Sequence, residues 1–184
     1  LDIATSRTYQ QSVSYNDSNR HDVANFSRAR FRRPRAEVLH DCLCQATDSP
    51  TRLGGFPLGT RAVQMPVASM TTYFLETFGR SDRETVCTCE VDVEPSLSQA
   101  LHLINGETTW GKIRHAGLVR RLLGQYEDPR RVVEELYIRC LTRKPTTEEM
   151  EHLATLLESA QDRGQVLEEI FWALLNSKEF LFNH

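Results

Sequence analysis

Apolar residues recur every three to four positions through the last sixty residues of the chain, which is the spacing of one face of an amphipathic helix. Three local patterns mark where helices should begin there: Asp128-Pro129, Thr146 followed by Glu149, and Ser177. We predict three helices with short connections and a short final turn, which is typical of an antiparallel helical bundle. The apolar positions on these helices are Val132, Val133, Leu136, Tyr137, Cys140, Leu153, Leu156, Leu157, Val166, Ile170, Phe171, Leu174 and Leu175. Five of these are expected to share one core, namely Leu136, Leu153, Leu157, Ile170 and Leu174.

The earlier part of the chain shows helical periodicity in shorter stretches that are separated by loops. The first thirty residues have no sustained period, and residues 48–66 carry three prolines and three glycines, which indicates a long irregular loop. Helices are predicted from near Pro34, over 69–78, over 96–105 and over 109–123. The last of these should end at Gly124.

The predicted fold class is therefore all-α, with an irregular N-terminal segment and helices followed by a C-terminal antiparallel helical bundle. Residues 1–125 would form the N-terminal helical part with long loops, and residues 126–184 the bundle, within one domain. The chain starts at Leu1 in ordinary structured sequence without a signal-peptide pattern. We therefore expect it to be a piece of a longer protein, truncated within the domain at its N-terminus.

Composition narrows the classes of function. With 184 residues, 40% of them hydrophobic and 26% charged, the chain can bury a sizeable core without disulfides or metal. The net charge of -3 gives no general attraction to nucleic acid, and no apolar stretch approaches the roughly 20 residues that span a bilayer. We therefore expect no nucleic-acid partner and no membrane span. No phosphate loop, dinucleotide fingerprint or nucleophile elbow is present.

Four of the five cysteines are candidates for a metal or disulfide site. Cys87-Thr88-Cys89-Glu90 places two thiols two residues apart in a segment without apolar periodicity. These thiols can ligate a metal ion with further ligands, form a disulfide, or be buried inert side chains. On a regular helix Cys42 and Cys44 point to nearly opposite faces, so these two cannot chelate one ion together. The candidate residues are Cys87, Cys89, Cys42 and Cys44.

A run of arginines is the candidate anion-binding site. It concentrates five guanidinium groups in eight residues, namely Arg28, Arg30, Arg32, Arg33 and Arg35. Such a cluster can bind an acidic polysaccharide or the propionates of a haem on a neighbouring domain. It can equally be a solvated face that pairs with Glu37, Asp41 and other acids.

Glu90 and His102 are the candidate pocket residues. His102 lies on the capped helix predicted over 96–105, where it can be a ligand or a structural histidine. An enzyme or redox domain would bring Cys87, Cys89, Glu90, the arginine run and a histidine together in one concave pocket.

Several phrases of the chain occur together in one known family. They include Thr5-Ser6-Arg7-Thr8-Tyr9, Arg32-Arg33 with Ala36-Glu37, Phe78-Gly79-Arg80, Cys87-Thr88-Cys89-Glu90, Ser98-Gln99-Ala100, Arg143-Lys144-Pro145-Thr146 and Asn176-Ser177-Lys178-Glu179-Phe180. In this order the chain resembles the planctomycete domain of unknown function 1553 over essentially its whole length. Three positions depart from the pattern, with Pro34 in place of an apolar helix former, Ser81 in place of proline and Val91 in place of arginine.

The resemblance implies the C-terminal domain of a large exported protein, at the periplasm or cell surface, which often carries a cytochrome c-like domain. It supplies no biochemical activity. We expect no cofactor on this segment, although haem c can occur on a neighbouring domain. In such a compartment at least one of Cys87 and Cys89 should be oxidised.

Three hypotheses follow for the function. The first is a non-catalytic helical module that packs against other domains of the same polypeptide, which predicts an exposed apolar patch. The second is an enzyme or redox unit beside a cytochrome c-like domain, acting for example in polysaccharide degradation. The third is a polysaccharide-binding module, which would need exposed aromatic side chains such as Trp110, Tyr9 or Tyr15 aligned along a groove.

Overall fold

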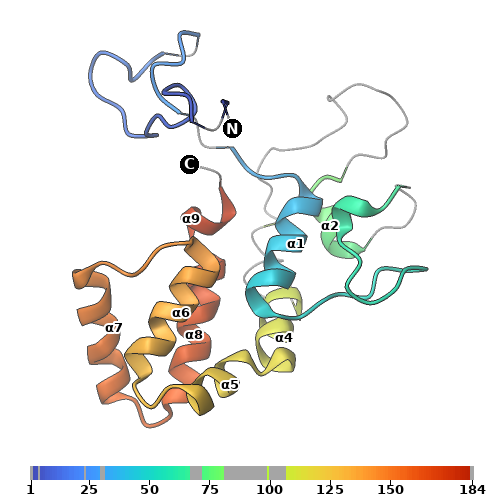
Figure 1. Ribbon diagram of the computed structural model, residues 1–184, viewed down its shortest axis with the longest axis vertical. Helices are drawn as coiled ribbons and strands as arrows, with labels where there is room; N and C mark the ends of the chain where they lie inside the picture. The colour runs from blue at the N-terminus through green and yellow to red at the C-terminus, as the bar shows by residue number, and fades with distance from the viewer. Residues whose placement is uncertain are drawn as a thin grey trace.

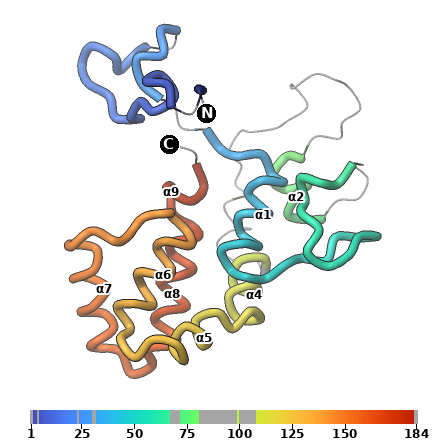
Figure 2. Tube along the Cα trace, in the orientation of Figure 1, coloured from blue at the N-terminus to red at the C-terminus, as the bar shows by residue number. Residues whose placement is uncertain are grey.

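The computed structural model describes residues 2–3, 5–22, 24–29, 32–66, 72–80, 99 and 107–182, and every regular element among them is a helix. No strand occurs in these ranges, and this confirms the all-α prediction. Figures 1 and 2 show two groups of helices side by side, a bundle near the C-terminus and a smaller group around α1. No helix of the described part is long and apolar enough to cross a bilayer.

The smaller group is built on α1 (Ala36–Thr47), which begins close to Pro34 as predicted and ends where Asp48 turns left-handed with a φ of 54°. The loop that follows contains one 3-10 turn, η1 (Ala62–Gln64). Asp41 on α1 holds this turn, because its carboxylate accepts the backbone N–H groups of Ala62 at 2.7 Å and Val63 at 3.2 Å. The irregular loop predicted over 48–66 is therefore tied to the helix before it.

Helix α2 (Tyr73–Thr77) begins at the cap Thr72. It ends just before Gly79, close to the predicted end at residue 78. Residues 69–71 of the predicted helix lie outside the described residues. So does the predicted helix over 96–105, apart from Gln99, which is helical.

The single helix predicted over 109–123 is two helices, α4 (Glu107–Ala116) and α5 (Leu118–Gln125). Gly117 separates them with a φ of 58°, a left-handed conformation that glycine adopts without steric cost. The predicted stop at Gly124 is wrong, since α5 continues through this residue to Gln125. The chain therefore turns at the first of the two glycines.

The C-terminal bundle consists of α6 (Pro129–Leu141), α7 (Thr147–Ser159), α8 (Arg163–Leu175) and the short α9 (Lys178–Leu181). Successive long helices run in opposite directions (Figure 1). The predicted caps are confirmed: Asp128 accepts the Arg130 N–H, Thr146 and Glu149 form a reciprocal capping box, and Ser177 accepts the Phe180 N–H. Asp162 caps α8 in the same way.

The predicted bundle core is confirmed. Leu136, Leu157, Ile170 and Leu174 belong to one buried cluster, and Leu153 packs against it partly buried. Leu156, which was not among these five, is 53% exposed.

The two groups of helices share one hydrophobic core that extends from Ala36 to Leu175. Helix α4 contacts both α1 and α8, and it therefore links the groups. At this junction the rings of Trp110 and Trp172 stack with centroids 5.9 Å apart, and Arg114 lies over Trp110. Trp110 is thus part of the packing between α4 and α8.

Candidate functional site

A stripe of polar side chains runs along the packed face of α1. Glu37, His40 and Cys44 are spaced three and four residues apart, so they lie on one side of the helix. The side chains of Glu37 and His40 are buried, and Cys44 is half-buried. Ionisable groups in such a position need partners, because burial penalises an unpaired polar group.

Glu37 meets Arg80 at the N-terminal end of the stripe. Glu37 Oε1 lies 3.5 Å from Arg80 Nε, and both side chains are almost fully buried. Glu37 belongs to the phrase Ala36-Glu37 and Arg80 to Phe78-Gly79-Arg80. Two phrases that are more than forty residues apart in the sequence therefore contribute the two halves of one buried ion pair.

Two further phrases meet beside this pair. The guanidinium of Arg33 donates to Gln99 Oε1 and lies 5.9 Å from the centre of the Phe78 ring. The amide of Gln99 in turn donates to the Thr77 carbonyl at 3.0 Å. Arg33 and Gln99 thus fasten the start of α1 to the end of α2.

Cys44 lies at the other end of the stripe, with hydrogen-bonding partners on two sides. Its Sγ is 3.8 Å from His40 Nδ1 and 3.5 Å from Thr51 Oγ1. Burial would raise the pKa of this thiol, but the His40 hydrogen bond and charge, the Thr51 hydroxyl and the Lys112 ammonium outweigh that effect and lower the pKa to about 6. A large fraction of Cys44 is therefore thiolate near neutral pH.

Lys112 brings a positive charge to this site from α4. Its side chain is buried, and its Nζ donates to the Ser49 carbonyl at 2.6 Å and to Thr51 Oγ1 at 2.7 Å. Among the described residues no carboxylate lies within ion-pair distance of this Nζ. Thr51 is the link between the two charged groups, since its hydroxyl contacts both Lys112 and Cys44.

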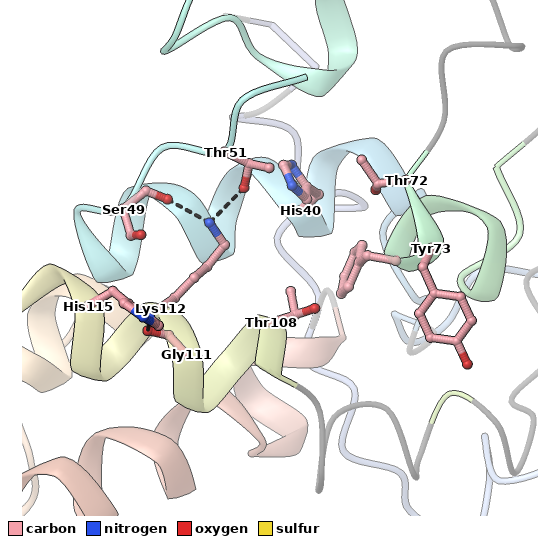
Figure 3. A pocket seen from close by; sticks show the side chains of 10 residues that line it. His40, Ser49, Thr51, Thr72, Tyr73, Thr108, Gly111, Lys112 and His115 are labelled. Atoms are coloured by element: carbon pink, nitrogen blue, oxygen red, sulfur yellow. Dashed lines mark hydrogen bonds between the residues drawn. The ribbon is translucent and has the colours of Figure 1, made fainter. Parts of the chain in front are cut away.

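A cavity of about 410 Å³ opens between α1, α2 and α4 on the Lys112 side of this link (Figure 3). Most of its lining residues carry a hydroxyl or an imidazole group, and no carboxylate lines it among the described residues. His40 lies between Thr51 and Thr72 in the view, and its ring is 5.6 Å from that of Phe74. The wall consists of His40, Ser49, Thr51, Thr72, Tyr73, Phe74, Thr108, Gly111, Lys112 and His115.

A second cavity, of about 340 Å³, lies on the Cys44 side. Asp41 and Asp48 line it, and each carboxylate has a cationic neighbour, namely Arg61 for Asp41 and Arg121 for Asp48. The thiol therefore faces open space on one side and the buried His40 and Lys112 on the other, and Thr51 lines both cavities.

A third surface feature belongs to the bundle. An apolar groove of about 530 Å³ runs over α6, α7 and α8, with Ser159 and Glu169 as polar members of its wall. The exposed Leu156 lies within it, so the side chain that the helix phase turns away from the core contributes to a concave apolar surface. The main apolar residues of the groove are Leu153, Leu156, Val166, Ile170, Ala173 and Leu174.

The predicted cysteine site is only partly within the described residues. Cys42 and Cys44 are both free thiols on α1, and their spacing of two residues directs the side chains to different sides of the helix. Cys87 and Cys89 lie outside the described residues, as do Glu90 and His102. Metal binding or a disulfide at Cys87 and Cys89 therefore stays a prediction. The described His, Cys, Asp and Glu residues form no group of three that could hold a metal ion.

The described members of the arginine run do not converge on one point. Arg28 donates to the carbonyls of Asn19 and Arg20 within the N-terminal segment, whereas Arg33 contacts Gln99. Arg32 and Arg35 are exposed, and Arg30 lies outside the described residues. The acids that the run was expected to pair with have other partners, since Glu37 contacts Arg80 and Asp41 contacts Arg61.

Comparison with known families decides what kind of domain this is. The profile of the family described as a protein of unknown function, DUF1553, matches residues 1–157. The chain belongs to this family. No curated protein and no solved structure matches it. The resemblance drawn from the short phrases is thereby confirmed, and two contacts of this DUF1553 domain, Glu37 with Arg80 and Arg33 with Gln99, join those phrases in space.

Two residues of the DUF1553 site were not predicted as site residues. Lys112 falls within the helix predicted over 109–123, directly before the inward-facing Ile113, and a lysine on an apolar face is a recognisable signal. Thr51 lies in the irregular loop, where its sequence gives no comparable signal. Only the folded chain brings it between Lys112 and Cys44.

Proposed function

We propose that this DUF1553 domain is a non-catalytic helical module that docks against another domain of the same exported polypeptide through the groove over α6, α7 and α8. The observation that carries the proposal is the position of Leu156, which is 53% exposed and lies within a concave apolar surface. A groove of this kind loses its contact with water when an apolar partner fills it, and that burial favours association.

The shape and chemistry of the groove favour an amphipathic helix as its occupant. Two roughly antiparallel helices, α7 and α8, form the walls, and an apolar helix face can lie between them with side chains at i, i+3, i+4 and i+7. Glu169 stands on the wall, and its carboxylate accepts from Gln165 Nε2 at 3.0 Å. A basic side chain beside the apolar face of the partner would form an ion pair with this carboxylate at the edge of the groove.

The multidomain and exported setting of the proposal comes from the resemblance described above. This resemblance supports a partner in the same polypeptide, where linkage would raise the effective concentration of the partner and a modest groove would be sufficient. The haem of a cytochrome c-like domain would belong to such a neighbour.

The experiment that tests this proposal places a photo-crosslinking amino acid at position 156 in the full-length protein. A matched control carries the same amino acid at Leu58, which is 58% exposed and lies in the loop before η1. We expect crosslinks from position 156 to a single segment outside this domain within the same polypeptide, and few from position 58. If position 156 yields no more crosslinks outside the domain than position 58, the docking proposal is rejected.

A further inference from the structure

The three described free cysteines have very different surroundings. Cys42 is exposed on α1, and desolvation followed by the charge of Asp41 raises its pKa. Cys140 is buried in the bundle, where burial raises its pKa to about 12. Cys44 is half-buried, yet its pKa is lowered. On this helix the more exposed thiol, Cys42, therefore has a raised pKa, whereas the less exposed thiol, Cys44, has a lowered pKa.

Cys44 is surrounded by hydrogen-bonding groups and a nearby cation, which are the features that stabilise a thiolate. An imidazole nitrogen lies 3.8 Å from Sγ, a hydroxyl lies at 3.5 Å, and the Lys112 ammonium bonds to the far side of the same hydroxyl. A thiolate needs such groups, because a buried negative charge without hydrogen bonds or a nearby cation is unfavourable. His40 is itself held in place by packing on Phe74.

A reactive thiol also requires access, and the second cavity provides it. Cys44 lines this cavity of about 340 Å³ together with Gln45, Pro50 and Thr60. The space admits a small reagent but restricts a large one. A reagent thus reaches Cys44 from this cavity, which Thr51 also lines and which His40 and Lys112 do not line.

We propose that Cys44 is a reactive thiol site that exchanges with low-molecular-weight disulfides. The thiol proton passes to His40, and the resulting thiolate attacks one sulfur of the disulfide. A new bond forms between Cys44 Sγ and that sulfur as the original sulfur–sulfur bond breaks. The second sulfur leaves as a thiolate and takes up a proton from His40 or water, so that one disulfide and one thiol are consumed and one of each is formed.

The charged groups that face Cys44 come from several elements. His40 and Asp41 lie on its own helix, Asp48 follows that helix, and Lys112 approaches from α4. Arg61 lies beside Asp41, and Arg121 of α5 pairs with Asp48. Because each of the two carboxylates has a cationic neighbour, Lys112 and His40 dominate the field at the thiol.

The first test measures alkylation by iodoacetamide at each cysteine of the full-length protein between pH 5 and 9, with fragment mass spectra separating Cys42 from Cys44. We expect the Cys44 rate to rise with a midpoint near 6. At pH 6, Cys44 should react faster than Cys42 on the order of tenfold, although it is less exposed. This ratio combines its larger thiolate fraction with the lower intrinsic reactivity of a less basic thiolate. A Cys44 rate that stays below that of Cys42 at pH 6 overturns the proposal.

The second test uses cystamine as the disulfide probe at pH 6, followed by mass analysis. A mixed disulfide should form at Cys44 before it forms at Cys42. Preferential modification of Cys42 contradicts the proposal. Cys140 serves as an internal monitor of folding in both tests, since it should stay unmodified as long as the bundle is intact.

Two variants test whether the charge of Lys112 lowers the pKa of Cys44. Lys112→Met keeps an unbranched side chain of nearly the same length and removes its charge, so the midpoint for Cys44 should move upward by about half a pH unit or more. The matched control Lys144→Met removes an exposed lysine that pairs with Glu134 and should leave the midpoint unchanged. An unchanged midpoint in Lys112→Met with Cys140 still protected removes Lys112 from the site. The comparison of Cys44 with Cys42 in the unaltered protein needs no variant and decides the proposal by itself.

Discussion

The bundle of α6 to α9 and the region around α1 share one core, yet they bury different chemistry. In the bundle the described residues that are fully buried are aliphatic or aromatic apart from Cys140. In the α1 region the buried set includes charged and polar side chains, namely Glu37, His40, Thr47, Arg80, Gln99, Thr109 and Lys112. The two regions therefore differ in how stability is obtained within a single hydrophobic core.

That difference indicates where each region contributes to function. An apolar bundle is stabilised by burial and packing, which leaves its outer groove free to serve as a binding surface. Buried ionisable groups contribute little net stability and are costly when a partner is missing. Their concentration along α1 is therefore more consistent with a chemical or positioning role than with packing alone.

The largest expected effect is in the bundle. Phe171 on α8 is fully buried, so Phe171→Ala removes apolar contacts and leaves a cavity. We expect this change to lower the free energy of unfolding by about 3 to 5 kcal/mol. Leu156→Ala is the control, because the side chain is more than half exposed and its loss from this chain should cost less than about 0.5 kcal/mol. Equal losses in urea denaturation would show that the helix phase described above is incorrect.

The next effect tests the polar region. Glu37→Gln keeps the shape of the side chain but leaves the buried Arg80 without this counter-charge, and it should cost about 3 kcal/mol. The control is Glu135→Gln on α6, which breaks a partly exposed pair with Arg139 and should cost about 0.5 kcal/mol. Denaturant titrations of both variants measure the difference. Similar small losses would mean that the pair of Glu37 and Arg80 is not a buried ion pair.

The sequence was most informative where structure is decided locally. The caps at Asp128, Thr146 and Ser177 could be predicted because each side chain bonds to a backbone N–H two or three residues further on. The inward-facing positions of the bundle followed from helical spacing, since an apolar face must pack against another.

The contacts of the polar site around α1 could not be predicted from local sequence patterns. Lys112 contacts Ser49 and Thr51 across more than sixty residues, and Glu37 meets Arg80 across more than forty. No spacing rule connects such pairs, because they depend on how α2 and α4 pack against α1. Glu37 and Arg80 belong to two of the family phrases, but their contact could be seen only in the folded chain.

The smallest expected effects concern the junction between the two regions, where the prediction of one continuous helix was wrong. Gly117 has a φ of 58° and Gly124 is helical, although a methyl group would meet no atom within 4 Å at either position. A Cβ atom therefore has room at both glycines, and the two positions differ in backbone conformation.

Gly117→Ala should accordingly destabilise the chain by about 1 kcal/mol, because an alanine in the left-handed conformation is strained. Gly124→Ala should stabilise it by about 0.5 kcal/mol, because alanine restricts the unfolded chain and favours helix. Thermal or denaturant unfolding of the two variants side by side measures these opposite signs. If both substitutions stabilise the protein, the backbone at residue 117 is helical, α4 and α5 form the single helix that the apolar pattern suggested, and the separation of the two regions at this glycine is refuted.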